Sequence, residues 1–357
     1  MIPMPREDTP LWDGVEPLEC VMVVPEAPEV RTFVFRPPSG ATFLFRAGQF
    51  ITLDLPIPGG PVQRTYTISS NPTTNAYIAV TVKAQKDSVA GRWMMEHLKP
   101  GVRLRAYGPA GLFHLPRQPD GKYLFISAGS GVTPMMSMAT VLFERGEEPD
   151  VTFIQCARRP NELIFRKRLE YMASRVQGMR LNFVVGQDDP YEVWTGYRGR
   201  FNQLMLGLMA PDYLDRDVYC CGPEGFMQAV RDMLNALGYD MSRYHQESFH
   251  APAGVVQEIT EFDDVVPQED VAAELVFATS GVSRSCAQTD TVLSVAKSAG
   301  LNIPSGCTFG VCGTCKVRKI SGDVHMVHSG GISEEDIADG FILACCSKPM
   351  GRVEVAV

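Results

Sequence analysis

A group of cysteines near the end of the chain has a spacing suited to holding a metal cluster. Cys307, Cys312 and Cys315 form a Cys-x4-Cys-x2-Cys loop, and the adjacent Cys345 and Cys346 follow later. A centre of two irons bridged by two sulfides needs four thiolates around one small volume, and a loop that supplies three plus a distant fourth can provide them. Zinc is the alternative, but it more often uses paired Cys-x2-Cys units. The pattern predicts a 2Fe-2S cluster, with either later cysteine as the fourth ligand on spacing alone.

A second candidate site is the run Arg64-Thr65-Tyr66-Thr67, which follows the apolar stretch QFITLDL. A cation, an aromatic ring and a hydroxyl carried by one extended strand suit a phosphate, a flat ring and a ring nitrogen. Arg and Tyr also alternate on many half-buried strands without binding anything. By itself the run is therefore weak evidence for a binding site, and the interpretation depends on the other motifs in the chain.

Two further segments have the form of a strand, a tight glycine turn and a helix. In FISAGSGVTPMMSM, Gly129 and Gly131 would let the turn approach a pyrophosphate, and the helix start would offer N-H groups to it. The motif is not a complete G-x-G-x-x-G, so an ordinary strand–helix turn is the alternative. In VYCCGPEGFM, Cys221 would end a parallel strand, at the edge where open α/β sheets bind ligands.

The segments around these motifs predict the elements that position them. Short alternating runs separated by Pro and Gly clusters over residues 19–115 predict an antiparallel barrel or sandwich with one short helix at 89–98. Strands that alternate with helices after residue 121, one of them near 162–175, predict a parallel α/β sheet. Residues 274–357 then start a new unit.

Charge and hydropathy exclude several classes of protein. The net charge of −8 argues against nucleic acid or an anionic membrane as a partner. No stretch approaches the roughly 18 apolar residues that a membrane span needs, and polar residues occupy the place of a secretory signal core. Ten cysteines then favour metal or redox chemistry over disulfides, so we expect a cytoplasmic protein.

Taken together, the motifs resemble the ferredoxin-NADP reductase superfamily with a fused plant-type ferredoxin. The resemblance implies a multidomain fold: an antiparallel β-barrel flavin domain, an α/β parallel-sheet nucleotide domain and an α+β β-grasp ferredoxin domain. The boundaries expected from it are 1–117 for the FAD-binding domain, 118–250 for the NAD(P)H-binding domain, 251–270 for an acidic flexible linker and 271–357 for the ferredoxin. The run GPAGLF at residues 108–113 is similar to FAD-binding rather than FMN-binding members.

The resemblance also assigns roles to individual residues. GFILACCSKP is similar to the ferredoxin segment in which the cysteine at the position of Cys345 is the fourth ligand, and Cys346 would then pack as a small apolar residue. Cys221 would lie near the nicotinamide, with Cys220 facing the other way, and Glu247 and Phe249 would close the reductase unit beside the flavin. The other assigned residues are Arg64, Tyr66 and Thr67 for the flavin pyrophosphate, ring and N5 region, Val89, Ala90 and Gly91 for phosphate-facing amides, and Gly129, Gly131, Thr133, Pro134, Gly222 and Pro223 for the nicotinamide nucleotide.

The preferred nicotinamide nucleotide follows from charge. Relatives specific for NADP place Ser-Arg after the strand that corresponds to LNFVV, whereas this chain has Asp188 and Asp189 nearby. Two carboxylates would repel a 2'-phosphate. Arg158 and Arg159 after the preceding strand could compensate, so NADH is expected and NADPH is the alternative.

Electron counting connects the three cofactors. A nicotinamide gives a hydride, a cluster takes single electrons and a flavin does both, which predicts an NADH-dependent reductase. The stretches LMAPDYLDRDVYCCGPEGFM and GYDMSRYHQESF look most like reductase components of Rieske-type monooxygenases that demethylate quaternary amines such as glycine betaine, proline betaine or carnitine. The alternatives are a reductase of a di-iron or aromatic-ring Rieske oxygenase or of a hybrid-cluster protein, and, from another class, a redox-sensing electron-carrier module.

Overall fold

The computed structural model describes residues 10–58, 60–85, 88–116, 121–145, 149–249, 271–306, 310, 313–328 and 331–357. The chain divides into two compact units, the first within the initial 250 residues and the second largely within Ala251–Val357. Among the described residues no helix is both long and apolar enough to cross a bilayer. The expected linker at residues 251–270 lies outside the described part of the chain.

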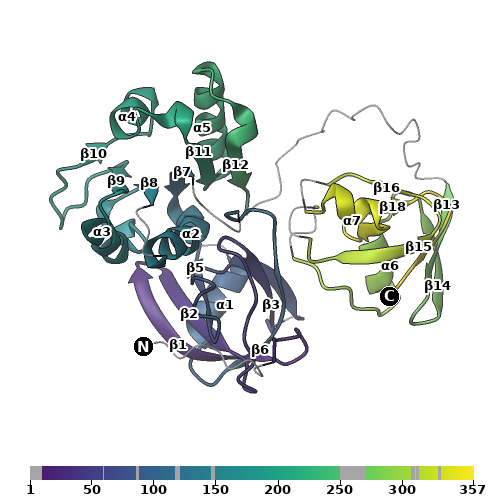
Figure 1. The fold of residues 1–357 in the computed structure, drawn as a ribbon. Helices are drawn as coiled ribbons and strands as arrows, with labels where there is room; N and C mark the ends of the chain where they lie inside the picture. The colour runs from purple at the N-terminus through teal and green to yellow at the C-terminus, as the bar shows by residue number, and fades with distance from the viewer. Residues whose placement is uncertain are drawn as a thin grey trace. The chain divides into compact units, whose positions relative to one another are not determined.

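The first unit begins with an antiparallel β-barrel (Figure 1). Its strands lie in the order β4-β3-β6-β1-β2-β5, and a bridge between Ile68 and Val80 joins the two ends of the sheet. Alternate side chains such as Phe33 and Leu53 fill the interior, as the alternating sequence predicts. The elements are β1 (Leu18–Ala27), β2 (Val30–Arg36), β3 (Phe50–Leu55), β4 (Val62–Thr67), β5 (Ile78–Lys83), α1 (Val89–His97) and β6 (Arg103–Ala110).

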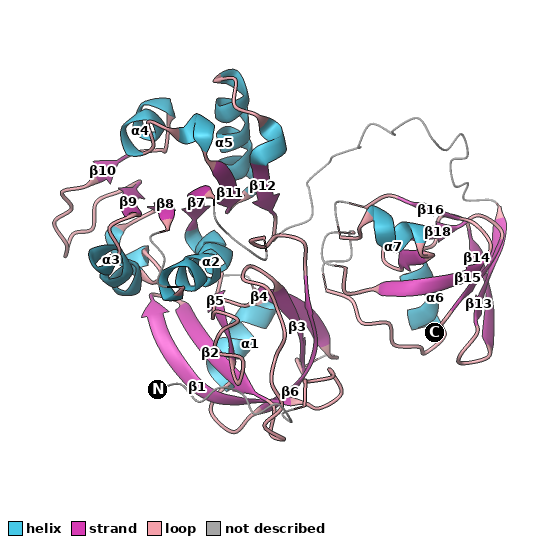
Figure 2. Ribbon diagram, viewed as in Figure 1, coloured by secondary structure: helices cyan, strands magenta, loops and turns pink. Residues whose placement is uncertain are grey.

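The rest of the first unit is a parallel sheet with strand order β10-β9-β8-β7-β11-β12 and helices on both faces (Figure 2). One face packs against α2 and α3, and the other packs against α4 and α5. The strands are β7 (Lys122–Ala128), β8 (Asp150–Ala157), β9 (Met179–Val185), β10 (Tyr197–Arg198), β11 (Asp217–Cys221) and β12 (Tyr244–Glu247). The α-helices are α2 (Val132–Glu144), α3 (Arg166–Arg175), α4 (Gln203–Met209) and α5 (Glu224–Ala236), and the 3-10 turns are Gly129–Gly131, Pro160–Glu162, Tyr213–Asp215 and Met241–Arg243.

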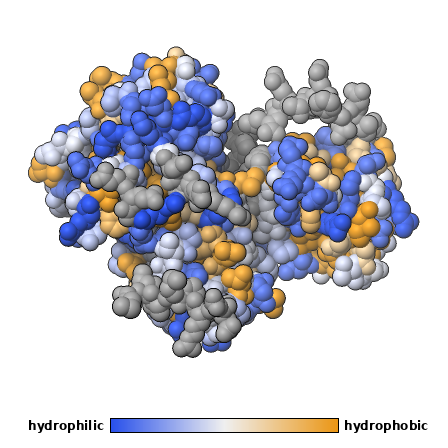
Figure 3. Space-filling view, in the orientation of Figure 1, coloured by the Kyte–Doolittle hydropathy of each residue, from blue (hydrophilic) through white to orange (hydrophobic). Residues whose placement is uncertain are grey.

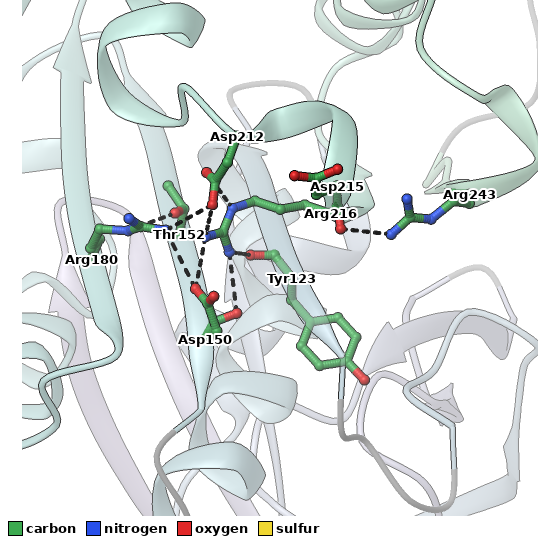
Figure 4. A network of polar contacts seen from close by, with 8 residues as sticks. All are labelled: Tyr123, Asp150, Thr152, Arg180, Asp212, Asp215, Arg216 and Arg243. Atoms are coloured by element: carbon green, nitrogen blue, oxygen red, sulfur yellow. Dashed lines mark hydrogen bonds and ion pairs between the residues drawn. The ribbon is translucent and has the colours of Figure 1, made fainter.

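A buried arginine holds the amino ends of three neighbouring strands in this sheet (Figure 4). The Arg216 side chain is fully buried, and its Nη2 lies 2.7 Å from Asp150 Oδ1 and 2.6 Å from Asp212 Oδ2. Its Nη1 donates to the carbonyl oxygens of Tyr123 and Asp150 at 3.2 and 3.3 Å. Arg180 adds an outer ion pair to Asp150 at 3.3 Å. The carboxyl edge of the sheet, where the motifs end, is thus opposite this network.

The second unit has a mixed five-stranded sheet in the order β14-β13-β19-β15-β17, with a two-stranded sheet β16-β18. Helix α6 packs Val292 and Ala296 into the core that the sheet forms. This is the β-grasp arrangement expected for the ferredoxin part. Its elements are β13 (Ala272–Phe277), β14 (Val282–Ala287), α6 (Val292–Ser298), β15 (Lys316–Ser321), β16 (Val324–Met326), α7 (Glu334–Ala338), β17 (Phe341–Leu343), β18 (Ser347–Pro349) and β19 (Arg352–Val355).

Helix α3 begins later than expected. The sequence predicts a helix from about residue 162, whereas the structure has a 3-10 turn at Pro160–Glu162 and α3 only from Arg166. The intervening Leu163 and Ile164 are buried, and Phe165 has a left-handed φ of 61°. Burial of these apolar side chains is therefore favoured over continuing the helix through residues 163–165.

Hydrophilic residues cover much of the visible face of the nucleotide-binding part (Figure 3).

Candidate functional site

Strand β4 places the expected flavin residues on the barrel. Arg64 is exposed, and its Nη1 donates to the Gln63 carbonyl at 2.8 Å. Tyr66 is half-buried against the barrel core. The Thr67 side chain is buried, and its hydroxyl has no hydrogen-bond partner within the described part of the chain. A buried hydroxyl of this kind is satisfied when a polar ligand atom lies beside it, so the strand fits the flavin that the sequence predicts.

Helix α1 starts at the expected phosphate-contacting segment. Val89 is 66% exposed, whereas Ala90 and Gly91 are buried. Ser88 caps the helix, because its Oγ accepts from the Gly91 amide at 3.0 Å. Any phosphate contact from Gly91 would share its amide with this cap.

The turn from β7 into α2 brings the expected nucleotide residues close to β11. Gly129 has a φ of 57°, and a Cβ added there would meet no other residue within 4 Å. Thr133 and Pro134 lie in the first turn of α2. A Cβ on Gly131 would lie 2.2 Å from the Cys221 carbonyl oxygen. Only glycine allows this approach, so the turn packs directly against the end of β11, while Gly129 and Ser130 remain partly exposed before the helix start. This arrangement fits a pyrophosphate at a helix start.

The carboxyl ends of β7, β11 and β12 bring three side chains together. Cys221 pairs in register with Ser127 on one side and with Glu247 on the other. Burial, and then the Glu247 carboxylate, raise the pKa of the Cys221 thiol well above its ordinary value. Cys221 is therefore a neutral thiol, suited to packing against a ring rather than to nucleophilic attack. Gly222 and Pro223 follow it directly and lead into α5.

The remaining residues expected near the flavin lie at the end of the last strand of the nucleotide sheet and just after it. Glu247 ends β12 and is 8% exposed, whereas Phe249 is 39% exposed. Cys220 packs into the core beneath α4 and α5, on the opposite face to Cys221.

Two of the four expected cluster ligands lie in the described part of the second unit. Cys315 and Cys345 are both buried, and the Cys345 amide donates to Cys315 Sγ at 3.4 Å. An N-H directed at sulfur stabilises a thiolate, so this pair fits an iron–sulfur centre. Cys346 Sγ lies 3.7 Å from the Leu343 carbonyl oxygen. Cys307 and Cys312 lie outside the described residues.

The acidic residues that bear on nucleotide choice have partners of their own. Asp188 Oδ1 accepts from Arg198 Nε at 2.8 Å, and Asp189 Oδ1 accepts from the Tyr191 amide at 2.8 Å. The two loops adjoin, because the amide of Gln187 donates to the Arg158 carbonyl at 2.8 Å. Arg158 and Arg159 are exposed. Charges of both signs therefore meet at this edge of the sheet.

Sequence reasoning missed the buried hydroxyls between the barrel and the nucleotide-binding part. Ser137 on α2 donates to the carbonyl of Ser70 at 2.5 Å, and Ser70 lies three residues after the end of β4. Ser69, Thr81 and Thr32 form a hydrogen-bonded series from three separate strand regions. No spacing along the sequence reveals such a series, although Thr32 and Thr81 are each followed by an apolar residue on their strands.

Three family profiles match successive parts of the chain. Residues 21–115 match the oxidoreductase FAD-binding domain, residues 125–232 the oxidoreductase NAD-binding domain, and residues 276–350 the 2Fe-2S iron-sulfur cluster binding domain. The reductase subunit of stachydrine N-demethylase from Rhizobium meliloti (strain 1021) is 60% identical, over 96% of this chain and 97% of that protein. The chain belongs to the monooxygenase reductase family. This reductase passes electrons from NADH through FAD and a 2Fe-2S cluster to a monooxygenase.

Other relatives of the reductase serve different monooxygenases. The glycine betaine monooxygenase reductase subunit of Pseudomonas aeruginosa (strain UCBPP-PA14) is 42% identical over 97% of both chains. The ferredoxin reductase component of 3-ketosteroid-9-alpha-monooxygenase from Mycobacterium tuberculosis (strain CDC 1551 / Oshkosh) is 32% identical over 96% of the reductase and 95% of that component. Phthalate dioxygenase reductase shares the fold, with a TM-score of 0.60 and 21% identity over 96% and 97% of the two chains.

Proposed function

We propose that the reductase serves a Rieske-type terminal monooxygenase that demethylates a quaternary amine, with proline betaine (stachydrine) as the first substrate to test and glycine betaine as the second. The observation that carries this proposal is the 60% identity to the stachydrine N-demethylase reductase subunit over nearly the whole of both proteins. The relative that serves a steroid monooxygenase is only 32% identical.

The proposed site residues act on bound groups in three places. Arg64, Tyr66 and Thr67 hold the flavin, which accepts a hydride and returns its electrons singly. Gly131 and the helix start that follows it hold the pyrophosphate of the nicotinamide nucleotide. The neutral Cys221 and the nearby Glu247 lie at the adjoining strand ends, where the nicotinamide would bind.

The cluster end of the proposal assigns four thiolates to the iron: Cys307, Cys312, Cys315 and Cys345. The proposed domain boundaries at 117/118, 250/251 and 270/271, with residues 251–270 as the linker, would tether this cluster to the flavin unit. A cytoplasmic location belongs to the proposal as well, because thiolate ligands need a reducing compartment.

An anaerobic titration tests the reductase part of the proposal. Addition of NADH is expected to bleach the flavin first and then the cluster, and NADPH is expected to do so at a higher concentration. Bleaching of neither chromophore by NADH would contradict the electron-transfer assignment and favour a redox-sensing module.

Oxygen uptake tests the partner. The reductase is mixed with NADH and the purified oxygenase component of stachydrine N-demethylase, and uptake is measured with proline betaine, glycine betaine, carnitine or a steroid. Uptake that requires a methylated amine is expected. Oxygen uptake that does not depend on any betaine would contradict the proposed partner and indicate that the reductase serves another oxygenase or electron acceptor.

A further inference from the structure

A continuous series of buried hydroxyls runs across the outer face of the barrel. Ser69 Oγ lies 2.9 Å from Thr81 Oγ1, which lies 2.7 Å from Thr32 Oγ1. Thr32 Oγ1 in turn donates to Glu26 Oε1 at 2.7 Å. The three hydroxyl residues are only 2%, 6% and 7% exposed, so bulk water does not carry these hydrogen bonds.

The hydrogen atoms of this series have one consistent direction. An ionised Glu26 carboxylate can only accept hydrogen bonds, so the single hydroxyl hydrogen of Thr32 is donated to Glu26. Thr81 must then donate to Thr32, and Ser69 donates to Thr81. The Ala79 carbonyl, 3.2 Å from Ser69 Oγ, is the alternative acceptor at the start of the series. Hydrogen-bonded series that are aligned in this way strengthen each link.

The series begins at Ser69, two residues after the end of β4, the strand that carries the proposed flavin residues. Thr67 and Ser69 project to the same side of the extended chain, because side chains two residues apart share a face, while Ile68 between them enters the barrel core. Thr67 has the buried hydroxyl without a partner among the described residues. Residues two apart are separated by about 7 Å, a gap that a single water can bridge.

The series ends at a carboxyl group that is suited to receiving a proton. Glu26 is half-buried on β1, and burial raises its pKa, against the opposing effects of the Thr32 hydrogen bond and the positive charge of Arg168 on α3. A raised pKa brings a carboxyl group closer to neutral pH, where it can both take and release a proton.

Electron counting requires a route for protons. Each hydride brings two electrons and one proton to the flavin, whereas the 2Fe-2S cluster removes only the electrons, so one proton must leave for every NADH oxidised. We propose that Ser69, Thr81 and Thr32 relay this proton to Glu26. The inference rests on the proposed flavin site at Thr67.

The transfer balances at each step. The departing proton binds Ser69 Oγ, and the hydrogen already on Ser69 moves to Thr81 while the hydrogen of Thr81 moves to Thr32. The hydrogen of Thr32 then forms an O-H bond with the Glu26 carboxylate. Glu26 releases this proton to solvent, and the three hydroxyls rotate back. No electrons move in the relay, because both pass to the cluster.

A set of variants separates relay from structure. Thr81→Val removes the central hydroxyl at nearly constant volume, and Thr81→Ser retains it. Thr140→Val is the matched control, because Thr140 is also buried and, among the described residues, its hydroxyl bonds the Met136 carbonyl at 2.7 Å and no member of the series. Glu26→Gln keeps a hydrogen-bond acceptor but cannot become a carboxylic acid. Glu247→Gln tests the other buried carboxyl group near the site.

Each holoprotein is first reduced anaerobically with one equivalent of NADH and then mixed with a one-electron oxidant. Flavin absorbance follows the electrons, a pH-indicator dye follows proton release, and time-resolved infrared spectroscopy follows a protonated carboxyl. We expect Thr81→Val and Glu26→Gln to slow proton release at least about tenfold, with flavin reduction by NADH within about twofold of wild type. Thr81→Ser and Thr140→Val should release protons like wild type, and Glu26→Gln should lack the infrared band.

Proton release at the wild-type rate in Thr81→Val would overturn the relay. Slow release in Glu247→Gln with normal release in Thr81→Val would also overturn it and place the exit at Glu247. If NADH does not reduce the wild-type flavin at all, the proposed function fails first, and the relay fails with it.

Discussion

At the scale of single residues, Arg216 shows how a buried positive charge is stabilised. Its guanidinium donates to two carboxylates and two backbone carbonyls, so all five of its donors are used. The hydrogen bond from Arg216 lowers the pKa of Asp212 to about 2. A carboxyl group whose pKa is depressed by folding stabilises the fold above its unfolded pKa, and this contribution is lost as the pH falls through the folded pKa.

Replacement of Arg216 by Met is expected to lower the free energy of unfolding at pH 7 by about 3 kcal/mol, because Asp150, Asp212 and the Tyr123 carbonyl lose the hydrogen bonds of the buried guanidinium. The difference from wild type should shrink as the pH falls from about 4 to 2. Urea denaturation followed by circular dichroism measures both effects. Arg180→Met is the control, because Arg180 pairs with the same Asp150 but is 47% exposed, and should cost less than about 1 kcal/mol. Equal losses in the two variants would contradict the buried-charge explanation.

The positions of the proposed site residues could be predicted better than the residues that support them. Cys221 ends β11 and Gly131 lies in the turn before α2, as expected, because motif and strand end coincide in the sequence. Arg216 could not, since its partners Asp150 and Tyr123 come from strands that meet it only after the sheet forms. The Ser69–Thr81–Thr32 series was invisible for the same reason.

At the scale of elements, the turn between β7 and α2 depends on close contact with β11. A Cβ on Gly131 would overlap the Cys221 carbonyl and would lie 2.6 Å from the Gly222 nitrogen. These are backbone atoms that cannot rotate away. Alternation and glycine placement predicted the strands and this turn, whereas the start of α3 was misplaced because local helix signals do not report the burial of Leu163 and Ile164.

Substitution of Gly131 by Ala should therefore destabilise the first unit by roughly 1–3 kcal/mol, because the added methyl group overpacks the contact. The affinity for NADH should fall at least about tenfold if the turn binds the pyrophosphate, since 1.4 kcal/mol corresponds to a factor of ten. Isothermal titration with NADH and urea denaturation measure the two effects. Gly225→Ala on α5 is the matched control, since its Cβ meets nothing within 4 Å. Unchanged NADH affinity in Gly131→Ala would contradict the assignment.

At the scale of the whole molecule, the two units have separate hydrophobic cores. In the first unit, separate clusters of buried residues fill the barrel and pack the two faces of the nucleotide-binding sheet, and a further cluster fills the mixed sheet of the second unit. A chain with separate cores can divide its chemistry, with hydride transfer in one unit and single-electron delivery in the other.

Residues 1–250 and 271–357, expressed separately, should each fold. The first fragment should reduce ferricyanide with NADH at close to the rate of the intact chain, and the second should hold the cluster spectrum. Mixed at micromolar concentration, they should reduce cytochrome c about 10²-fold more slowly than the intact chain, because the effective concentration given by the tether is lost. Equal rates for the mixture and the intact chain would show that covalent linkage is unimportant.

The nucleotide-binding sheet keeps its anchoring charges and its ligand-facing loops at opposite edges. Arg216 and its partners lie where the strands begin, while Arg158 and Asp188 follow strands β8 and β9 where they end. If the loops after β8 and β9 set the cofactor preference, as the charge argument predicts, stability and preference can be engineered independently. A library that varies the loops after β8 and β9 could select for use of the phosphorylated nucleotide without eroding the protein's tolerance to heat.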